Sequence, residues 1–236
     1  MDLLPKNHDQ FRQTDYWDSF FKKRGRKAFE WYGEYAELCG VLHKYIKIKD
    51  QILMVGCGNS TLSADLFDVG YKDLVSIDLS SVVIKQMKQQ HERPRPGLEF
   101  KEMDVTKMDF ENDKFSCVLD KGTLDAMFTN DSEDVKKKID EMFTEIGRVL
   151  RFGGRYICIS LLQPHILDYI VKWFNGSGWP VRILRCKEAE ENKSPEERIF
   201  PVFAVVATKF KKMPNMPTVS QLNKNNELFW ATAYLT

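Results

Sequence analysis

The sequence has almost no excess of charge of either sign. Its 236 residues include 35 lysines and arginines against 34 aspartates and glutamates, a formal net charge of +1. Proteins that bind nucleic acid through its phosphates need a large positive excess, so the balance argues against that class. Apolar residues make up 43% of the chain, which excludes wholesale disorder. We therefore expect a folded chain without direct, specific nucleic-acid binding.

Long hydrophobic runs are also missing. No uninterrupted apolar stretch approaches the roughly 20 residues that cross a membrane, and Met1–Gln10 lacks the apolar segment of a secretion signal. The cysteines are odd in number, scattered and mostly set in apolar runs, which favours reduced thiols: Cys39, Cys57, Cys117, Cys158 and Cys186. These features predict a cytoplasmic protein with no membrane association.

Metal-binding spacings are absent from the sequence as well. No Cys-x-x-Cys motif occurs, and the four histidines are spread along the chain: His8, His43, His91 and His165. Structural zinc sites need such closely spaced ligands. We predict no metal site.

From residue 52 onward, short apolar runs alternate with helical periods. Expected strands lie at residues 52–55, 74–77, 98–100, 115–119 and 156–161, and the longest expected helix spans residues 133–150. Gly153 and Gly154 read as a turn. Such alternation predicts an α/β fold, a Rossmann-like doubly wound sheet that is mostly parallel with helices on both faces.

Both ends of the chain depart from this alternation. Residues 179–186 and 202–208 read as two strands with only the charged loop 187–198 between them, so they predict a C-terminal antiparallel hairpin that completes a seven-stranded sheet. Aromatic and charged residues interleave near the N-terminus, ahead of an amphipathic helix over residues 34–46. We expect an aromatic and helical cover (1–50), one sheet domain (51–210) and a C-terminal tail (211–236).

A glycine loop follows the first expected strand. Gly56 and Gly58 stand where a strand turns directly into a helix, which brings backbone N–H groups and the positive helix end to a ligand. The third glycine of the dinucleotide fingerprint is missing, because Thr61 stands at its position. The loop therefore suits a nucleoside without a phosphate better than a pyrophosphate.

Two carboxylates follow the next two strands. Asp78 ends the second strand, about 20 residues after Gly56, where an acid accepts both ribose hydroxyls of a nucleoside. Asp104 follows the third strand at the same edge of the sheet, in position for an adenine amino group. The alternative is that either carboxylate merely caps a loop or a helix. The glycine loop and both acids together favour one binding pocket.

The fourth strand ends in the sequence Asp120-Lys121-Gly122-Thr123. We predict that Asp120 is the catalytic candidate, because at this central edge it would orient an acceptor or take up its proton. Lys121 would contact a cofactor or fix the loop. Thr123 resembles a helix N-cap, and Asp125 in the first helical turn is favoured by the dipole, so we expect a structural role for Asp125.

Several short blocks together resemble a known family. They are Asp15–Asp18, Glu30–Gly33, Val55–Ser60, Ile77–Asp78, Met103–Val105 and Asp120–Ala126. These blocks resemble the seven-β-strand S-adenosylmethionine-dependent methyltransferases that modify translation elongation factor 1-alpha, in particular the N-terminal domain of two-domain members. The resemblance covers roughly residues 1–210. The second domain of those members has no counterpart in this sequence.

The resemblance implies a cofactor, an acceptor and a set of site residues. The cofactor would be S-adenosyl-L-methionine, and the acceptor a lysine, with an N-terminal amine as a further possibility, of translation elongation factor 1-alpha. The cofactor-binding residues that the resemblance implies are Trp17, Phe21, Trp31, Gly56, Asp78, Leu79, Asp104, Val105 and Lys121. The glycine loop adds Gly58 to this set.

Two questions stay open at the level of sequence. A sulfonium cation attracts the faces of aromatic rings, so Trp17, Phe21 and Trp31 would form a lid over the cofactor's methionine moiety. Equally, these rings would serve as anchors that pin an N-terminal helix to the sheet. The alternative functions are a catalytically silent interaction module with the same fold, or a methyltransferase acting on RNA or a small molecule.

Overall fold

The computed structural model describes residue 5, residues 7–191 and residues 200–210. The predicted tail over residues 211–236 and most of the predicted charged loop lie outside the described residues. The division into cover, sheet domain and tail stays a prediction.

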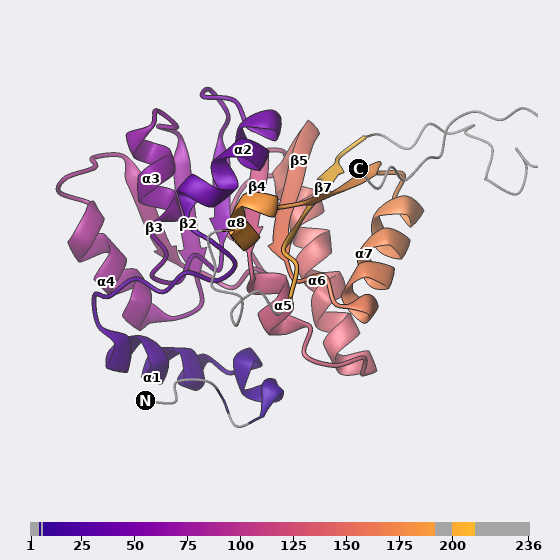
Figure 1. Cartoon of the computed structure of the whole chain (residues 1–236), viewed down its shortest axis with the longest axis horizontal. Helices are drawn as coiled ribbons and strands as arrows, with labels where there is room; N and C mark the ends of the chain where they lie inside the picture. Colours follow the sequence, from indigo (N-terminus) through magenta and orange to yellow (C-terminus); the bar gives the residue numbers. More distant parts are fainter. Residues whose placement is uncertain (1–4, 6, 192–199, 211–236) are drawn as a thin grey trace, which may run out of the picture.

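A seven-stranded sheet forms the centre of the molecule (Figure 1). Its order is β3-β2-β1-β4-β5-β7-β6. The strands are β1 (Ile52–Val55), β2 (Leu74–Asp78), β3 (Leu98–Glu102), β4 (Phe115–Lys121), β5 (Leu150–Ser160), β6 (Val181–Arg185) and β7 (Phe203–Thr208). Strands β1 to β5 pair in parallel, and β7 pairs antiparallel with both β5 and β6. The predicted doubly wound fold with a C-terminal antiparallel hairpin is confirmed.

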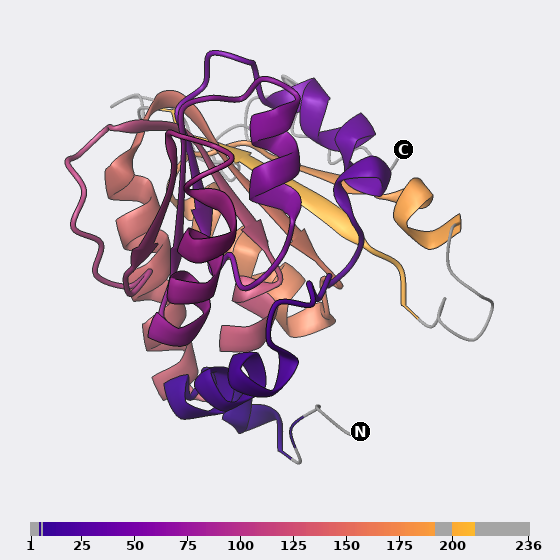
Figure 2. The same cartoon turned by 90° about the vertical axis from the view of Figure 1, so that its left-hand side faces the viewer.

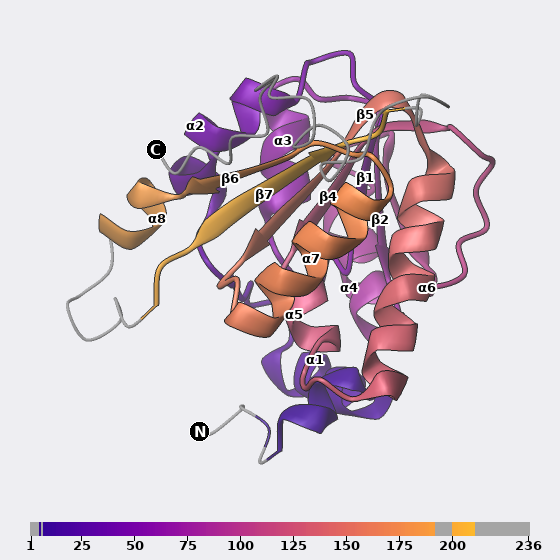
Figure 3. The same cartoon turned by 90° about the vertical axis from the view of Figure 1, so that its right-hand side faces the viewer.

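Helices cover both faces of the sheet, which Figures 2 and 3 show between two helical layers. One layer holds α2 (Tyr35–Tyr45), α3 (Leu62–Asp68) and α4 (Ser81–His91), and the other holds α5 (Thr123–Met127), α6 (Glu133–Val149) and α7 (Pro164–Gly176). Alternate side chains of β1 enter opposite cores: Ile52 and Met54 face one layer, and Leu53 and Val55 the other. Burial on both faces explains why these strands read as continuous apolar runs.

The N-terminal segment forms two elements whose bounds were not predicted from the sequence. A short 3₁₀ helix, η1 (His8–Arg12), precedes α1 (Thr14–Arg24), which packs against α4 near the carboxyl ends of the first strands (Figure 1). Two consecutive residues of α1, Phe20 and Phe21, are both buried. The apolar residues of α1 share one face, but they occupy only a short segment of a helix that is otherwise mostly polar, so the periodic signal is weak.

Two details at β5 and after β6 also differ from prediction. Strand β5 runs through Gly153 and Gly154, which were predicted to form a turn; instead the pairing with β4 shifts register between Phe115 and Cys117. The predicted charged loop contains a short helix, α8 (Lys187–Glu191), whose Ala189 is fully buried. One buried alanine in a charged run is too weak a signal for a helix. Among the described residues, no helix has the length and hydropathy needed to cross a membrane.

Candidate active site

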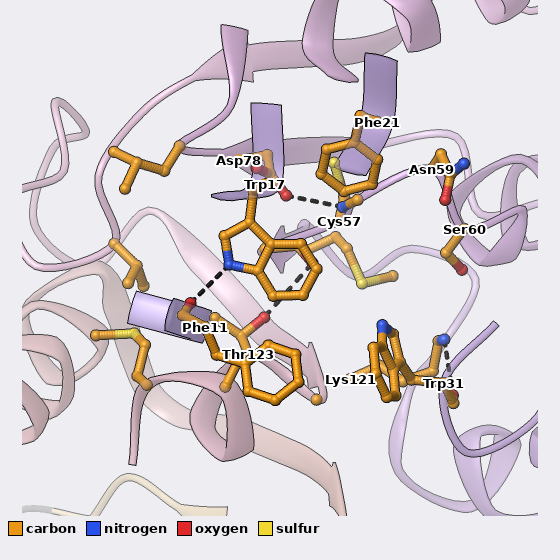
Figure 4. A pocket seen from close by; sticks show the side chains of 18 of the residues that line it. Phe11, Trp17, Phe21, Trp31, Cys57, Asn59, Ser60, Asp78, Lys121 and Thr123 are labelled. Carbon is orange, nitrogen blue, oxygen red and sulfur yellow. Dashed lines mark hydrogen bonds between the residues drawn. The ribbon is translucent and has the colours of Figure 1, made fainter. Parts of the chain in front are cut away.

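A cavity of about 320 Å³ opens at the carboxyl ends of β1, β2, β3 and β4 (Figure 4). This is the edge where open α/β sheets bind their ligands, and the volume falls in the usual range for small-molecule sites. All of the predicted cofactor-binding residues line it: Trp17, Phe21, Trp31, Gly56, Gly58, Asp78, Leu79, Asp104, Val105 and Lys121. The structure thus brings them together, and their contacts with a ligand stay predictions.

Asp78 holds the glycine loop against the end of β2. Its Oδ2 accepts the N–H of Gly58 at 2.8 Å, and its Oδ1 accepts the N–H of Ser80 at 2.9 Å (Figure 4). Burial raises the pKa of Asp78. The side chain is half-buried and lies on the cavity wall. Each carboxylate oxygen has further lone pairs, so the same group can organise the loop and accept ribose hydroxyls.

Asp104 is also both a turn residue and a wall residue. Its Oδ1 accepts two hydrogen bonds from Thr106, from the backbone N–H and the hydroxyl, each at 2.8 Å. These bonds fix the turn after β3, as the capping alternative proposed. Met103, Asp104 and Val105 nevertheless line the cavity together. The two carboxylates and the glycine loop therefore form one wall that fits a nucleoside.

Aromatic rings of the N-terminal segment form the opposite wall. The Trp17 ring stacks with Phe11 and Phe21, at centroid distances of 5.7 and 5.9 Å, and its Nε1–H donates to the Phe11 carbonyl at 2.6 Å (Figure 4). Trp31 meets Phe29 edge to face at 4.8 Å. These rings both line the cavity and pack the N-terminal segment onto the fold. The geometry thus accommodates both of the alternatives left open by the sequence.

The Lys121 ammonium is buried and paired on the cavity wall. Its Nζ donates to Glu30 Oε2 and to the Trp31 carbonyl, both at 2.9 Å. Burial lowers the pKa of Lys121, against the attraction of Glu30. The sequence analysis did not single out Glu30, although a lysine in a buried strand end implies a carboxylate partner somewhere in the chain.

Asp120 lies behind the cavity rather than on its wall. The side chain is fully buried, and it accepts the N–H of Thr123 at 2.8 Å, the N–H of Leu124 at 3.2 Å and the hydroxyl of Tyr156 at 2.8 Å. Desolvation raises the pKa of Asp120 to about 7. Asp120 caps the start of α5, where Gly122, not Thr123, occupies the N-cap position. This geometry gives Asp120 a structural part and does not support the predicted role of orienting an acceptor.

Asp125 joins the N-terminal segment to the end of β5. It accepts the Ser160 hydroxyl at 2.6 Å, the N–H of Leu161 at 3.1 Å and the hydroxyl of Tyr32. Burial raises the pKa of Asp125. The backbone of Tyr32 has φ +66°, an unusual conformation for a non-glycine residue. The structural role expected for Asp125 agrees with these contacts, and Tyr32 is a contributor that the sequence analysis missed.

Comparison with known proteins shows the family to which the chain belongs. Residues 46–179 match the family model described as a methyltransferase domain. The human eEF1A lysine and N-terminal methyltransferase is 52% identical over 216 residues, covering 91% of this chain and 31% of that protein. The mouse EEF1A lysine methyltransferase 4 is 37% identical over 169 residues, covering 69% of this chain and 66% of that protein.

The chain spans about a third of the length of the first of these relatives. Among solved structures, a SAM-dependent methyltransferase from Methanosarcina mazei shares the fold, with a TM-score of 0.55 and 16% identity over 73% of this chain and 98% of that one. The chain therefore belongs to the methyltransferase-domain family, whose methyl donor is S-adenosylmethionine.

Proposed function

We propose that this chain is a protein methyltransferase that transfers a methyl group from S-adenosylmethionine to a lysine of eEF1A. The observation that carries the proposal is the convergence of the glycine loop, Asp78, Asp104 and the aromatic wall on one cavity. The acceptor is suggested by the relatives, because the human eEF1A lysine and N-terminal methyltransferase is 52% identical over nearly all of this chain. The free state of all five cysteines fits a reducing compartment, and we propose the cytoplasm.

When bound, S-adenosylmethionine supplies a methyl group activated by its sulfonium. The residues of this chain then have to bind the nucleoside, orient the sulfonium and keep water away from the acceptor amine. Asp78 and Asp104 provide acceptors for the nucleoside, and Trp17 and Trp31 provide ring faces and an apolar wall. A lysine amine attacks only as the neutral base, so its ammonium proton has to pass to solvent before the attack. The chain then contributes the orientation and desolvation of the neutral amine.

A transfer assay tests this proposal. The purified chain is incubated with radiolabelled S-adenosylmethionine and either purified eEF1A or a cell lysate, beside an Asp78→Ala variant as the control. Label on eEF1A that requires the intact Asp78 supports the proposal. Label on RNA or on small molecules would favour a different acceptor, and cofactor binding without any transfer would favour a catalytically silent module.

A further inference from the structure

We propose that Glu30 is a positioning residue that fastens the aromatic cover to the floor of the cavity, so that closure of the cover and cofactor binding are coupled. We use the term aromatic cover for residues 8–33, a part of the cover predicted over residues 1–50. These residues hold η1, α1 and the aromatic rings that line the cavity. The inference rests on the proposed function for the identity of the cofactor. The fastening itself follows from contacts of this chain alone.

The Glu30 carboxylate bonds to two separate parts of the cavity floor. Its Oε1 accepts the N–H of Thr61 at 2.6 Å, and its Oε2 accepts the Ser60 hydroxyl at 2.7 Å. The same Oε2 receives Lys121 Nζ at 2.9 Å. Ser60 and Thr61 follow the glycine loop, whereas Lys121 ends β4. One side chain of the cover therefore bridges the two loops between which the cavity opens.

Neighbouring contacts fix the same stretch of the cover to the glycine loop. The Asn59 side chain accepts the N–H of Phe29 at 3.2 Å and donates to the Lys27 carbonyl at 2.9 Å. The residues on either side of Glu30, Phe29 and Trp31, both line the cavity. A shift of Glu30 would therefore move two aromatic rings of the wall at once.

The electrostatics of this contact make it dependent on both partners. The Lys121 side chain is 4% exposed and that of Glu30 is 11% exposed. A buried charge is tolerated only while it is paired, so neither group can lose the other without a change in the local structure. Opening of the cover would separate the pair, and closing would restore it.

The fastened segment lies outside the part of the chain that the family model matches. The match spans residues 46–179, and it includes the glycine loop and Lys121 but not Glu30. Glu30 thus connects the shared methyltransferase fold to an N-terminal addition. This is the position expected of a residue that sets how that addition closes the site.

The test uses the whole chain with Glu30→Ala and Glu30→Gln, and with Glu133→Gln as the matched control. Glu133 pairs with Lys136 on the exposed surface, away from the cavity. Three readouts are taken. The first is the dissociation constant of S-adenosylmethionine by calorimetry, the second is hydrogen–deuterium exchange of residues 8–33 without ligand, and the third is the split between KM and kcat in the transfer assay.

We expect Glu30→Ala to weaken cofactor binding at least about 10-fold and to speed exchange across residues 8–33, while the sheet stays protected. Glu30→Gln keeps an oxygen for the Thr61 N–H and loses the charge opposite Lys121, so an intermediate loss is expected. KM for the cofactor should rise with the dissociation constant, and kcat at saturation should change less than about twofold.

The coupling itself is tested by Glu30→Ala combined with Lys121→Met. If the pair acts as one unit, the double variant loses little more affinity than Glu30→Ala alone. Wild-type affinity together with unchanged exchange in Glu30→Ala would overturn the inference. Failure of the wild-type chain to bind S-adenosylmethionine would instead overturn the proposed function, and the ligand-free exchange would still decide whether Glu30 fastens the cover.

Discussion

Thr123 occupies the space that a side chain on Gly56 would need. A Cβ at Gly56 would lie 2.0 Å from Thr123 Oγ1, and that hydroxyl donates to the Val55 carbonyl at 2.9 Å. Gly56 also has φ +57°, a conformation that favours glycine. The turn that leaves β1 and the start of α5 therefore interlock at the floor of the cavity.

This interlock predicts that Gly56→Ala is more damaging than Gly58→Ala. Both glycines have positive φ, which costs about 1–3 kcal/mol for alanine. At Gly58 the added Cβ would meet only the Phe21 ring, at 3.4 Å. We expect Gly58→Ala to lower the free energy of unfolding by about that amount, and Gly56→Ala to lower it further and abolish S-adenosylmethionine binding. Urea denaturation and calorimetry measure both, and equal effects of the two variants would contradict the interlock.

Replacement of Asp78 is expected to reduce the affinity for S-adenosylmethionine more than it reduces the stability of the fold. In Asp78→Ala the cofactor loses its proposed ribose acceptor, and charge-assisted hydrogen bonds contribute about 1.5–3 kcal/mol each. We expect S-adenosylmethionine to bind about 10- to 100-fold more weakly or worse. Asp78→Asn keeps one oxygen for the N–H of Gly58 or Ser80, so it should unfold at a higher urea concentration than Asp78→Ala while still binding poorly. Unchanged affinity in Asp78→Ala would show that the nucleoside binds elsewhere.

The parts of the site that the sequence predicted are those encoded over short distances. Gly56, Gly58 and Asp78 follow strands whose apolar runs are unambiguous, and the parallel arrangement then places the strand ends together. The same reasoning located Asp104. No partner distant in sequence is needed to recognise these positions.

The parts that sequence analysis missed depend on contacts between distant segments. Glu30 meets Lys121 across about 90 positions of sequence, and Tyr32 meets Asp125 across a similar separation. The burial of the Asp120 side chain was not predicted, for a related reason. Its position at a strand end is typical of a site residue, but Tyr156, from the neighbouring strand β5, and the start of α5 use its oxygens. One sequence does not reveal that an acid at a strand end turns toward the core.

The raised pKa of Asp120 predicts a specific dependence of the free energy of unfolding on pH. Its pKa is raised to about 7 in the folded protein, above the value of 3.8 for a free carboxyl. The folded state therefore holds the proton more tightly, and this contribution to stability is complete below about pH 4 and lost as the pH rises to about 7. A shift of about three pH units corresponds to about 4 kcal/mol.

The measurement compares the wild type with Asp120→Asn between pH 4 and pH 8. Asparagine does not titrate, so the difference in unfolding free energy should move by up to about 4 kcal/mol in favour of Asp120→Asn as the pH rises. Acids that do not interact with Asp120 titrate equally in both proteins and cancel, whereas Asp125, whose charge also raises the pKa of Asp120, contributes to the difference. A difference independent of pH would show that Asp120 is ionised throughout.

Tyr32→Phe is expected to destabilise the fold through Asp125. The substitution removes a hydroxyl that donates to a buried carboxylate, which costs about 1–3 kcal/mol. Without this donor the pKa of Asp125 rises further, so the cost should be greater at pH 8 than at pH 5. Tyr35→Phe is the matched control, since its hydroxyl pairs with His43 at an exposed position, and it should change stability by less than about 0.5 kcal/mol at pH 8. Equal losses in the two variants would contradict the role of Tyr32.

Trp17 distinguishes whether the aromatic wall recognises the sulfonium or only anchors the N-terminal segment. Its ring makes stacked pairs with Phe11 and with Phe21 and lines the cavity. Trp17→Phe keeps a ring face and loses the Nε1–H bond to the Phe11 carbonyl, whereas Trp17→Leu keeps apolar bulk and loses the ring. A cation near a ring gains about 0.5–2 kcal/mol, or roughly 2- to 30-fold in affinity.

The informative readout is the ratio of two affinities, for S-adenosylmethionine with its positive sulfonium and for S-adenosylhomocysteine with its neutral thioether. If the ring recognises the cation, Trp17→Leu should weaken binding of the charged cofactor by roughly that factor beyond any loss for the neutral one, and Trp17→Phe should preserve most of the preference. If the ring is only an anchor, both ligands should lose affinity equally in Trp17→Leu, because displacement of the wall affects the shared nucleoside and not the charge.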